Sequence, residues 1–163
     1  MISSMSSERI VYREGENFMK RIRMENGKKM EEILKAVGPA GATIKKEGQW
    51  DFAVYIEDED DESILIEMCE KKDYKGDLIM DPYMRIYLEK DKDGHITQAI
   101  PKAYQSDSLV MGRTDINEKG EIFLNLKLME TKPGELDRRL ESWLHSIDGI
   151  GYLTEPDKII FHE

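Results

Sequence analysis

The stretch from Gly76 to Leu109 reads GDLIMDPYMRIYLEKDKDGHITQAIPKAYQSDSL. Two strand-like segments within it, Tyr83–Glu89 and His95–Tyr104, flank the short segment Asp91–Gly94. Every second residue of the first segment is apolar, which is the period of a half-buried strand. The connecting segment ends in Asp-Gly, and Gly94 accepts the positive φ of a tight turn at little steric cost. This stretch therefore predicts an antiparallel hairpin, on which the rest of the chain is expected to pack.

The composition is that of a water-soluble globular chain. It has 163 residues, of which 39% are hydrophobic and 36% are charged. No apolar run is long enough to span a membrane, and the first residues lack the apolar segment of a signal peptide. The single cysteine, Cys69, excludes an intramolecular disulfide. We therefore expect one domain's worth of core and a cytoplasmic location.

The net charge of -10 is unevenly distributed along the chain. Residues 1–29 carry a net charge of +3, so the remaining 134 residues carry -13. Nucleic-acid binding requires clustered Lys and Arg side chains, which this acidic part lacks. The charge favours a basic protein as partner over direct binding of nucleic acid, although solubility alone would also explain it.

Two helices are predicted. The first covers Lys28–Val37, with Asn26 as N-cap and Gly38-Pro39 as the stop signal. Its apolar stripe consists of Met30, Ile33, Leu34 and Val37. Residues 1–26 show no sustained apolar period, so they are expected to form a weakly ordered extension before a single domain at 27–163.

The second helix is predicted over Glu135–Ile147, with Pro133 near its first turn and Gly149 as its stop signal. Its apolar stripe consists of Leu136, Leu140, Trp143, Leu144 and Ile147.

Further strands are predicted from alternating apolar residues. They are Thr43–Lys46 as an edge strand, Trp50–Glu57, Ser63–Cys69, Glu121–Met129 and Lys158–Phe161 as a last edge strand. Lys71–Lys75 is expected to be a polar connection and Ser106–Asp115 to be irregular. The predicted fold is α+β, an antiparallel sheet of about five strands with two helices packed on one face.

Two sets of residues suggest protein binding. The first is a run of carboxylates that must lie in solvent: Glu57, Asp58, Glu59, Asp60, Asp61 and Glu62. The second lies on the predicted outward face of the central hairpin, where Tyr83, Arg85 and Tyr87 alternate with core residues. Tyr and Arg often anchor protein interfaces. A solvated loop and ordinary exposed strand residues are the plainer interpretations of both sets.

Four short motifs occur here in a fixed order. They are GDL-x2-DP-x-M in Gly76–Met84, YQ-x-D-x-L in Tyr104–Leu109, L-x3-L-x2-WL in Leu136–Leu144, and Gly151-Tyr152. Together the motifs resemble a family of small proteins carried by plasmids, conjugative elements and phages, whose activity is not established. The resemblance covers roughly Met30 to Tyr152. It implies a mobile genetic element as the setting and supplies no catalytic residues.

The usual catalytic and metal motifs are missing from the sequence. Asp91–Gly94 resembles part of a calcium loop, but the position of the required glutamate is taken by Ile100 and the flanks are strand-like. The histidines and the cysteine are not paired at zinc-ligand spacing: His95, His145, His162 and Cys69. There is no nucleophile elbow and no phosphate-binding glycine loop. We therefore expect no cofactor and no enzymatic activity.

An alternative ligand site would use Asp77, Asp81, Tyr104 and Asp107, with Arg85 nearby. Clustered aspartates can hold magnesium or perform acid–base chemistry, although such residues more often cap turns.

The sequence therefore favours a non-enzymatic accessory protein of a mobile element that acts by binding another protein. The most concrete form is an acidic inhibitor of a host nucleic-acid-targeting defence enzyme, that is, an anti-CRISPR or anti-restriction protein. The alternatives are a metal-dependent hydrolase or small-ligand binder at the aspartates, and a structural subunit in conjugation or plasmid maintenance.

Overall fold

The computed structural model describes residues 2–106, 109–111, 113–116, 122–125 and 134–163. The helices in this part of the chain are α1 (Ile2–Val37) and α2 (Glu135–Ile150). The strands are β1 (Gly41–Lys45), β2 (Asp51–Glu59), β3 (Ser63–Tyr74), β4 (Asp77–Lys90), β5 (Ile96–Ser106), β6 (Leu109–Met111), β7 (Arg113–Ile116), β8 (Ile122–Asn125) and β9 (Lys158–Phe161).

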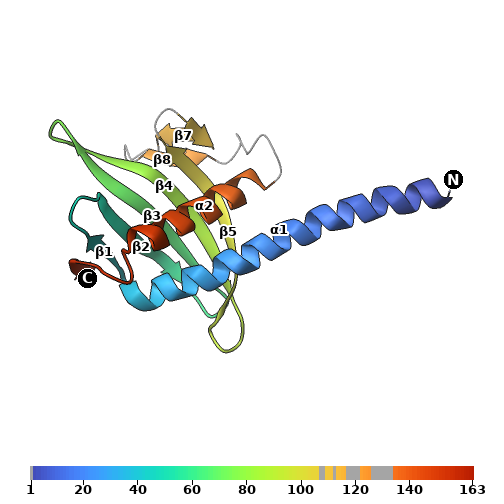
Figure 1. Ribbon diagram of the computed structural model, residues 1–163, viewed down its shortest axis with the longest axis horizontal. Helices are drawn as coiled ribbons and strands as arrows, with labels where there is room; N and C mark the ends of the chain where they lie inside the picture. The colour runs from blue at the N-terminus through green and yellow to red at the C-terminus, as the bar shows by residue number, and fades with distance from the viewer. Residues whose placement is uncertain (1, 107–108, 112, 117–121, 126–133) are drawn as a thin grey trace.

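Seven of the strands form one antiparallel sheet in the order β6-β5-β4-β3-β2-β1-β9. Strands β1 to β6 follow one another as a meander, and β9 returns to pair with β1 on the far side. β7 and β8 form a separate two-stranded hairpin. Both helices cross the same face of the large sheet (Figure 1). The predicted α+β fold with two helices on one face is confirmed, with seven strands in place of about five.

The central hairpin is formed by β4 and β5, as predicted. The register runs from Tyr83 opposite Gln105 to Lys90 opposite Ile96. In the turn, the Asp91 carboxylate Oδ1 accepts hydrogen bonds of 2.9 Å from two backbone N–H groups, those of Asp93 and His95. Gly94 has φ of 84°. The Asp-Gly turn chemistry therefore sets this hairpin.

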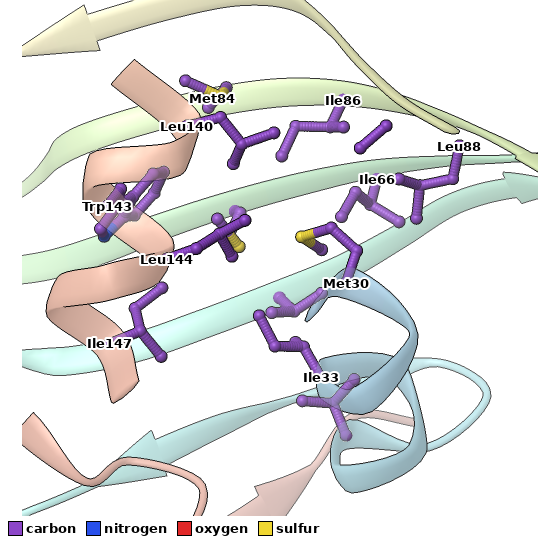
Figure 2. Close-up of a cluster of buried hydrophobic side chains, with 14 of the residues drawn as sticks. Met30, Ile33, Ile66, Met84, Ile86, Leu88, Leu140, Trp143, Leu144 and Ile147 are labelled. Atoms are coloured by element: carbon purple, nitrogen blue, oxygen red, sulfur yellow. The ribbon is translucent and has the colours of Figure 1, made fainter. Parts of the chain in front are cut away.

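The core lies between the helices and the sheet. α1 supplies Met30 and Ile33, and α2 supplies the stripe predicted from the sequence, all of which is buried (Figure 2). The strands contribute alternate residues, including Ile66, Met84, Ile86 and Leu88. Each such side chain contributes about 1.5–3 kcal/mol through burial, which makes this layer the main stabilising feature of the fold.

Helix α1 begins far before the position predicted at Asn26. Ile22 and Asn26 are 3% and 2% exposed, and the Asn26 side-chain amide donates a 3.2 Å hydrogen bond to the backbone oxygen of Asp137. A Cβ on Gly27 would lie 3.3 Å from the backbone of Gln98 in β5. Asn26 and Gly27 therefore serve helix packing inside α1, and the prediction of an N-cap there was wrong.

The two helices are joined by an ion pair. Arg23 Nε lies 2.9 Å from Asp137 Oδ1, and the Asp137 side chain is only 1% exposed. Residues 2–26, which were expected to be a weakly ordered extension, are thus the N-terminal part of α1. The first turns of this helix project beyond the sheet (Figure 1).

Two strand predictions need correction. The segment expected to be an edge strand near Thr43–Lys46 is β1, which is paired on both sides, with β2 and β9. The segment Lys71–Lys75, expected to be a polar connection, is mostly the end of β3. It leads into a tight turn in which Lys75 and Gly76 both have positive φ, 54° and 88°. Backbone hydrogen bonds to β4 and this turn stabilise the end of β3, so the strand continues here without an apolar pattern in the sequence.

Other boundaries shift in the second half of the chain. The segment Ser106–Asp115, predicted to be irregular, contains β6 and part of β7. The predicted strand Glu121–Met129 is represented by β8, and residues 126–129 lie outside the described residues, as does Pro133. Helix α2 passes through Gly149 and ends at Ile150, and Gly151 with φ of 90° is its C-cap. β9 matches the prediction for Lys158–Phe161.

Candidate functional site: the open face of the sheet

The sheet face opposite the helices, here called the open face, carries the predicted hairpin residues. Because side chains alternate along β4, the buried residues Met84 and Ile86 place Tyr83, Arg85 and Tyr87 on this face, where they are half-buried. None of the helices in the described part of the chain covers the open face (Figure 1).

A charged and aromatic cluster occupies the middle of the open face. Tyr55 of β2 lies opposite Glu67 of β3, and Glu67 lies opposite Arg85 of β4. The Arg85 guanidinium contacts Glu57 through Nη2 at 2.9 Å and Nε at 3.0 Å, both to the same carboxylate oxygen. The side chains of Glu57 and Arg85 are 25% and 39% exposed, so this ion pair is only partly screened by water.

The Glu67 carboxyl of this cluster has a strongly raised pKa. Burial raises its pKa to about 7, and the hydrogen bond and negative charge of Glu57 add to this effect. A hydrogen bond from Tyr83 and the charge of Arg85 act in the opposite direction. Glu67 therefore keeps its proton up to about neutral pH. Burial also raises the pKa of the Tyr83 hydroxyl, with the Glu67 charge as the next cause.

Such a carboxyl group could transfer protons, since a pKa near the working pH favours general acid–base catalysis. Catalysis also requires a bound substrate within hydrogen-bond reach. The hollow at the adjoining end of the sheet, described below, is lined by neither Glu57 nor Glu67. The cluster thus forms a pH-sensitive charge network on the open face, outside this hollow.

An aromatic stack extends the cluster toward β9. The rings of Tyr55 and His162 are parallel within 12°, with centroids 4.5 Å apart. The Lys71 ammonium lies 5.0 Å from the Tyr55 ring centroid, and His162 Nε2 lies 2.9 Å from Thr43 Oγ1. Burial and the Lys71 charge lower the pKa of His162.

The carboxylate run forms one end of the sheet together with the turn of the central hairpin. We call the combined surface the acidic end; its members are Asp58, Glu59, Asp60, Asp61, Glu62, Glu89, Asp91 and Asp93. The two loops are joined by a 2.9 Å backbone hydrogen bond from Lys90 to Glu62. Between them lies a hollow of about 940 Å³, lined by residues 61–62 and 89–94 and by Tyr87. The acidic end is thus continuous with the open face.

The carboxylates of the β2–β3 loop have different roles. Asp60 accepts hydrogen bonds of 2.8 Å from the backbone N–H groups of Glu62 and Ser63, which lower its pKa and fix the turn. Glu59 forms a 3.2 Å ion pair with Lys90. Asp58, Asp61 and Glu62 form no ion pair among the described residues. All five are exposed, as predicted, and among them the carboxylates of Asp58, Asp61 and Glu62 face solvent without an ion pair to any described residue.

The residues of the alternative ligand site are not brought together. Asp77 is exposed at the start of β4, and Asp81 lies four residue steps, about 13 Å, further along the same strand. Asp81 is 8% exposed and lies 3.6 Å from Lys72 Nζ. Tyr104 is buried opposite Met84. Arg85 is on the open face, paired with a glutamate, and Asp107 lies outside the described residues.

Metal and thiol chemistry find little support in the described residues. Within them, no three His, Cys, Asp or Glu side chains are grouped so that they could hold a metal ion. Cys69 is buried, and burial raises the pKa of its thiol to about 11. Neither helix, as far as the chain is described, is long and apolar enough to cross a membrane.

Sequence reasoning missed Glu67, Tyr55, Lys71 and His162 as members of this surface. The two-residue period of the strands is consistent with Tyr55 and Glu67 on the outward face, because both alternate with buried residues. Their pairing depends on the register, and the register shifts at a bulge after Ile56. The position of His162 depends on β9 pairing with β1, which no local pattern indicates.

Comparison of the chain with protein-family models, with curated proteins and with solved structures finds no match. The resemblance to mobile-element proteins therefore stays a prediction.

Proposed function

We propose that this chain is a non-enzymatic protein-binding module whose partner contacts the acidic end and the adjoining open face. One observation carries the proposal: Tyr87 lines the acidic hollow, and Arg85 pairs with Glu57 at the end of the carboxylate run. The two sets of residues suggested by the sequence are thus parts of one continuous surface.

The partner is a basic protein. The acidic end contains eight carboxylates, whereas the cations between them are Lys90, which is already paired, and Lys92. A concentrated negative charge steers a positive surface during encounter and rejects partners of the same sign. Tyr83, Arg85 and Tyr87 supply the side chains that anchor such a contact once it forms.

The class of partner that fits best is a nucleic-acid-targeting defence enzyme, such as a CRISPR effector or a restriction enzyme. These enzymes hold nucleic acid in positively charged channels. An acidic end of this kind competes with the phosphate backbone for such a channel. The chain would then act as an inhibitor carried by a mobile genetic element, in keeping with the resemblance of its motifs.

The test measures binding to purified effector nucleases and inhibition of their DNA cleavage, at low and moderate salt. The loop variant Asp58→Asn/Asp61→Asn/Glu62→Gln removes three charges that form no ion pair within the described residues. We expect it to weaken binding about tenfold or more and to reduce the salt dependence.

The matched control is Glu25→Gln/Glu32→Gln/Glu141→Gln, which removes three exposed charges from the helices. It should change the affinity less than about twofold, because these residues lie across the sheet from the open face. Equal losses in both variants would show that only net charge matters. Inhibition that survives in the loop variant would refute the acidic-end proposal. A thermal shift with magnesium or manganese would favour the hydrolase alternative instead.

A further inference from the structure

A second hollow, of about 690 Å³, lies on the helix side of the sheet between α2 and the strands β4 and β5. Its α2 wall presents polar side chains at helical spacing: Arg138, Arg139, Ser142 and Ser146. Its other walls are formed by Pro82, Tyr104 and Trp143. The open face and the acidic end contribute no residue to this lining.

Arg139 is incompletely satisfied where it stands. Its guanidinium lies 5.1 Å from the centroid of the Tyr104 ring, and Nη2 is 3.5 Å from Glu135 Oε1. Its Nε is buried and has no hydrogen-bond partner among the described residues. Since a buried charged donor without a partner is costly, a small rotation toward an added anion would be favourable.

Arg138, Ser142 and Ser146 on the α2 wall are also donors, whereas Glu135 on the same wall is an acceptor. Arg138 is exposed, with its guanidinium 5.3 Å from the Phe18 ring of α1, and the residues Ser142 and Ser146 are exposed one turn apart. Two arginines and one glutamate line the hollow, which gives it a local charge of opposite sign to the chain's -10. An anion is therefore attracted here, although most of the surface repels it.

The remaining wall is apolar and aromatic. Trp143 is 7% exposed, and its Nε1 has no hydrogen-bond partner of normal geometry among the described residues. Burial raises the pKa of the nearby Glu70 carboxyl, and the Trp143 indole acts in the opposite direction. The Tyr104 ring and Pro82 complete this wall. It suits a flat organic group lying beside the arginines.

We infer that this hollow binds a small organic anion, with its carboxylate or phosphate on Arg138 and Arg139 and its flat body against Trp143. Tyr104 belongs both to this hollow and to the ligand site suggested by the sequence, but the expected ligand has the opposite charge. A cation held by aspartates is replaced by an anion held by arginines. This site is independent of the proposed protein-binding surface, because the two lie on opposite faces of the sheet.

The experiment titrates phenyl phosphate, benzoate and inorganic phosphate into the full chain and follows Trp143 fluorescence. A Trp50→Phe background removes the other tryptophan, which is 46% exposed and lies outside the hollow. We expect saturable binding of phenyl phosphate or benzoate, with inorganic phosphate at least about tenfold weaker because it lacks the flat body. The arm that binds more tightly identifies phosphate or carboxylate as the anionic group.

Arg138→Gln should weaken the binding about tenfold, because it removes a charge-assisted contact. Arg21→Gln is the matched control, since it removes one exposed arginine of α1, and it should change the affinity less than about twofold. Ser142→Ala/Ser146→Ala tests the hydroxyls without changing the charge. Saturable binding unaffected by Arg138→Gln, tight binding of inorganic phosphate alone, or no saturation by any probe would overturn the inference.

Discussion

Replacing Glu67 by glutamine removes the proton-binding carboxyl of the open face while keeping its size and a hydrogen-bonding end. Glu67 is half-buried, and its pKa in the folded chain is raised from the usual 4.5 to about 7. Between these two pH values the folded chain holds a proton that the unfolded chain has released. The stability from Glu67 is therefore complete below about pH 4.5 and is lost as the pH rises through about 7.

The magnitude follows from the size of the pKa change. A rise from 4.5 to about 7 would correspond to about 3.4 kcal/mol if it were fully expressed in the free energy of unfolding. Because Glu67 is only half-buried, solvent screening reduces this to about 1–2 kcal/mol. Glutamine carries no charge at any pH and can donate its amide to Glu57. The Glu67→Gln chain should therefore be about 1–2 kcal/mol more stable than the wild type at pH 8 and nearly equal at pH 5.

Urea unfolding at a series of pH values between about 5 and 8 measures this difference directly, because urea is uncharged. Other groups with shifted pKa values, such as Glu31 and Glu70, are present in both chains and cancel in the comparison. Glu32→Gln, at an exposed position of α1, is the control and should show no such dependence. If the difference in unfolding free energy between Glu67→Gln and wild type stays constant from pH 5 to pH 8, the pKa of Glu67 is not raised in the folded chain.

Two further substitutions test the packing that was hidden from the sequence. Arg23→Ala leaves the buried Asp137 carboxylate without its Arg23 partner and should lower the free energy of unfolding by about 2–3 kcal/mol. Arg21→Ala, on the exposed side of the same helix, should lower it by less than about 0.5 kcal/mol. Equal unfolding midpoints of the two variants in urea would contradict the ion pair. Gly41→Ala would put a Cβ 2.0 Å from a backbone carbonyl oxygen of β2 at φ of 89°, and should cost about 2–4 kcal/mol. Gly48→Ala, with φ of 77° but open space around it, should cost only about 1–2 kcal/mol, so similar thermal midpoints for the two glycine variants would disprove the close contact.

Elements with strong local chemistry were the ones that sequence could predict. The alternation in Tyr83–Glu89 and the turn at Asp91–Gly94 determine their own conformation, and the structure has the hairpin as expected. The same holds for the stripe of α2 that runs from Leu136 to Ile147, because an apolar face at helical spacing has one way to be buried. Exposure of the carboxylates at Asp58–Glu62 follows from their mutual repulsion alone.

The predictions were wrong where a tertiary contact, and not the local sequence, determines the role of a residue. Asn26 and Gly27 read as a helix start, yet the amide binds a backbone oxygen of α2 and the glycine lets α1 approach β5. The candidate site shows the same limit. Tyr87 and Arg85 could be placed on the outward face by period, but their contact with the carboxylate run requires the register across β2, β3 and β4. No sequence pattern indicated a binding role for Arg139, because its hollow forms only where α2 crosses the sheet.

The position of β1 inside the sheet also has a consequence for folding while the chain is being synthesised. Thr43 of β1 is hydrogen-bonded to His162, which follows β9 and is 119 residues later in the chain. Until β9 emerges, β1 is an edge strand whose backbone N–H and C=O groups are unpaired on one side. Its residues Ala42 to Ile44 are buried in the complete fold. A nascent chain therefore presents an unpaired strand edge from the synthesis of β1 until that of β9. The arrival of β9 replaces that edge with a strand of four residues that begins with a lysine, and both its short length and the lysine disfavour the addition of another strand.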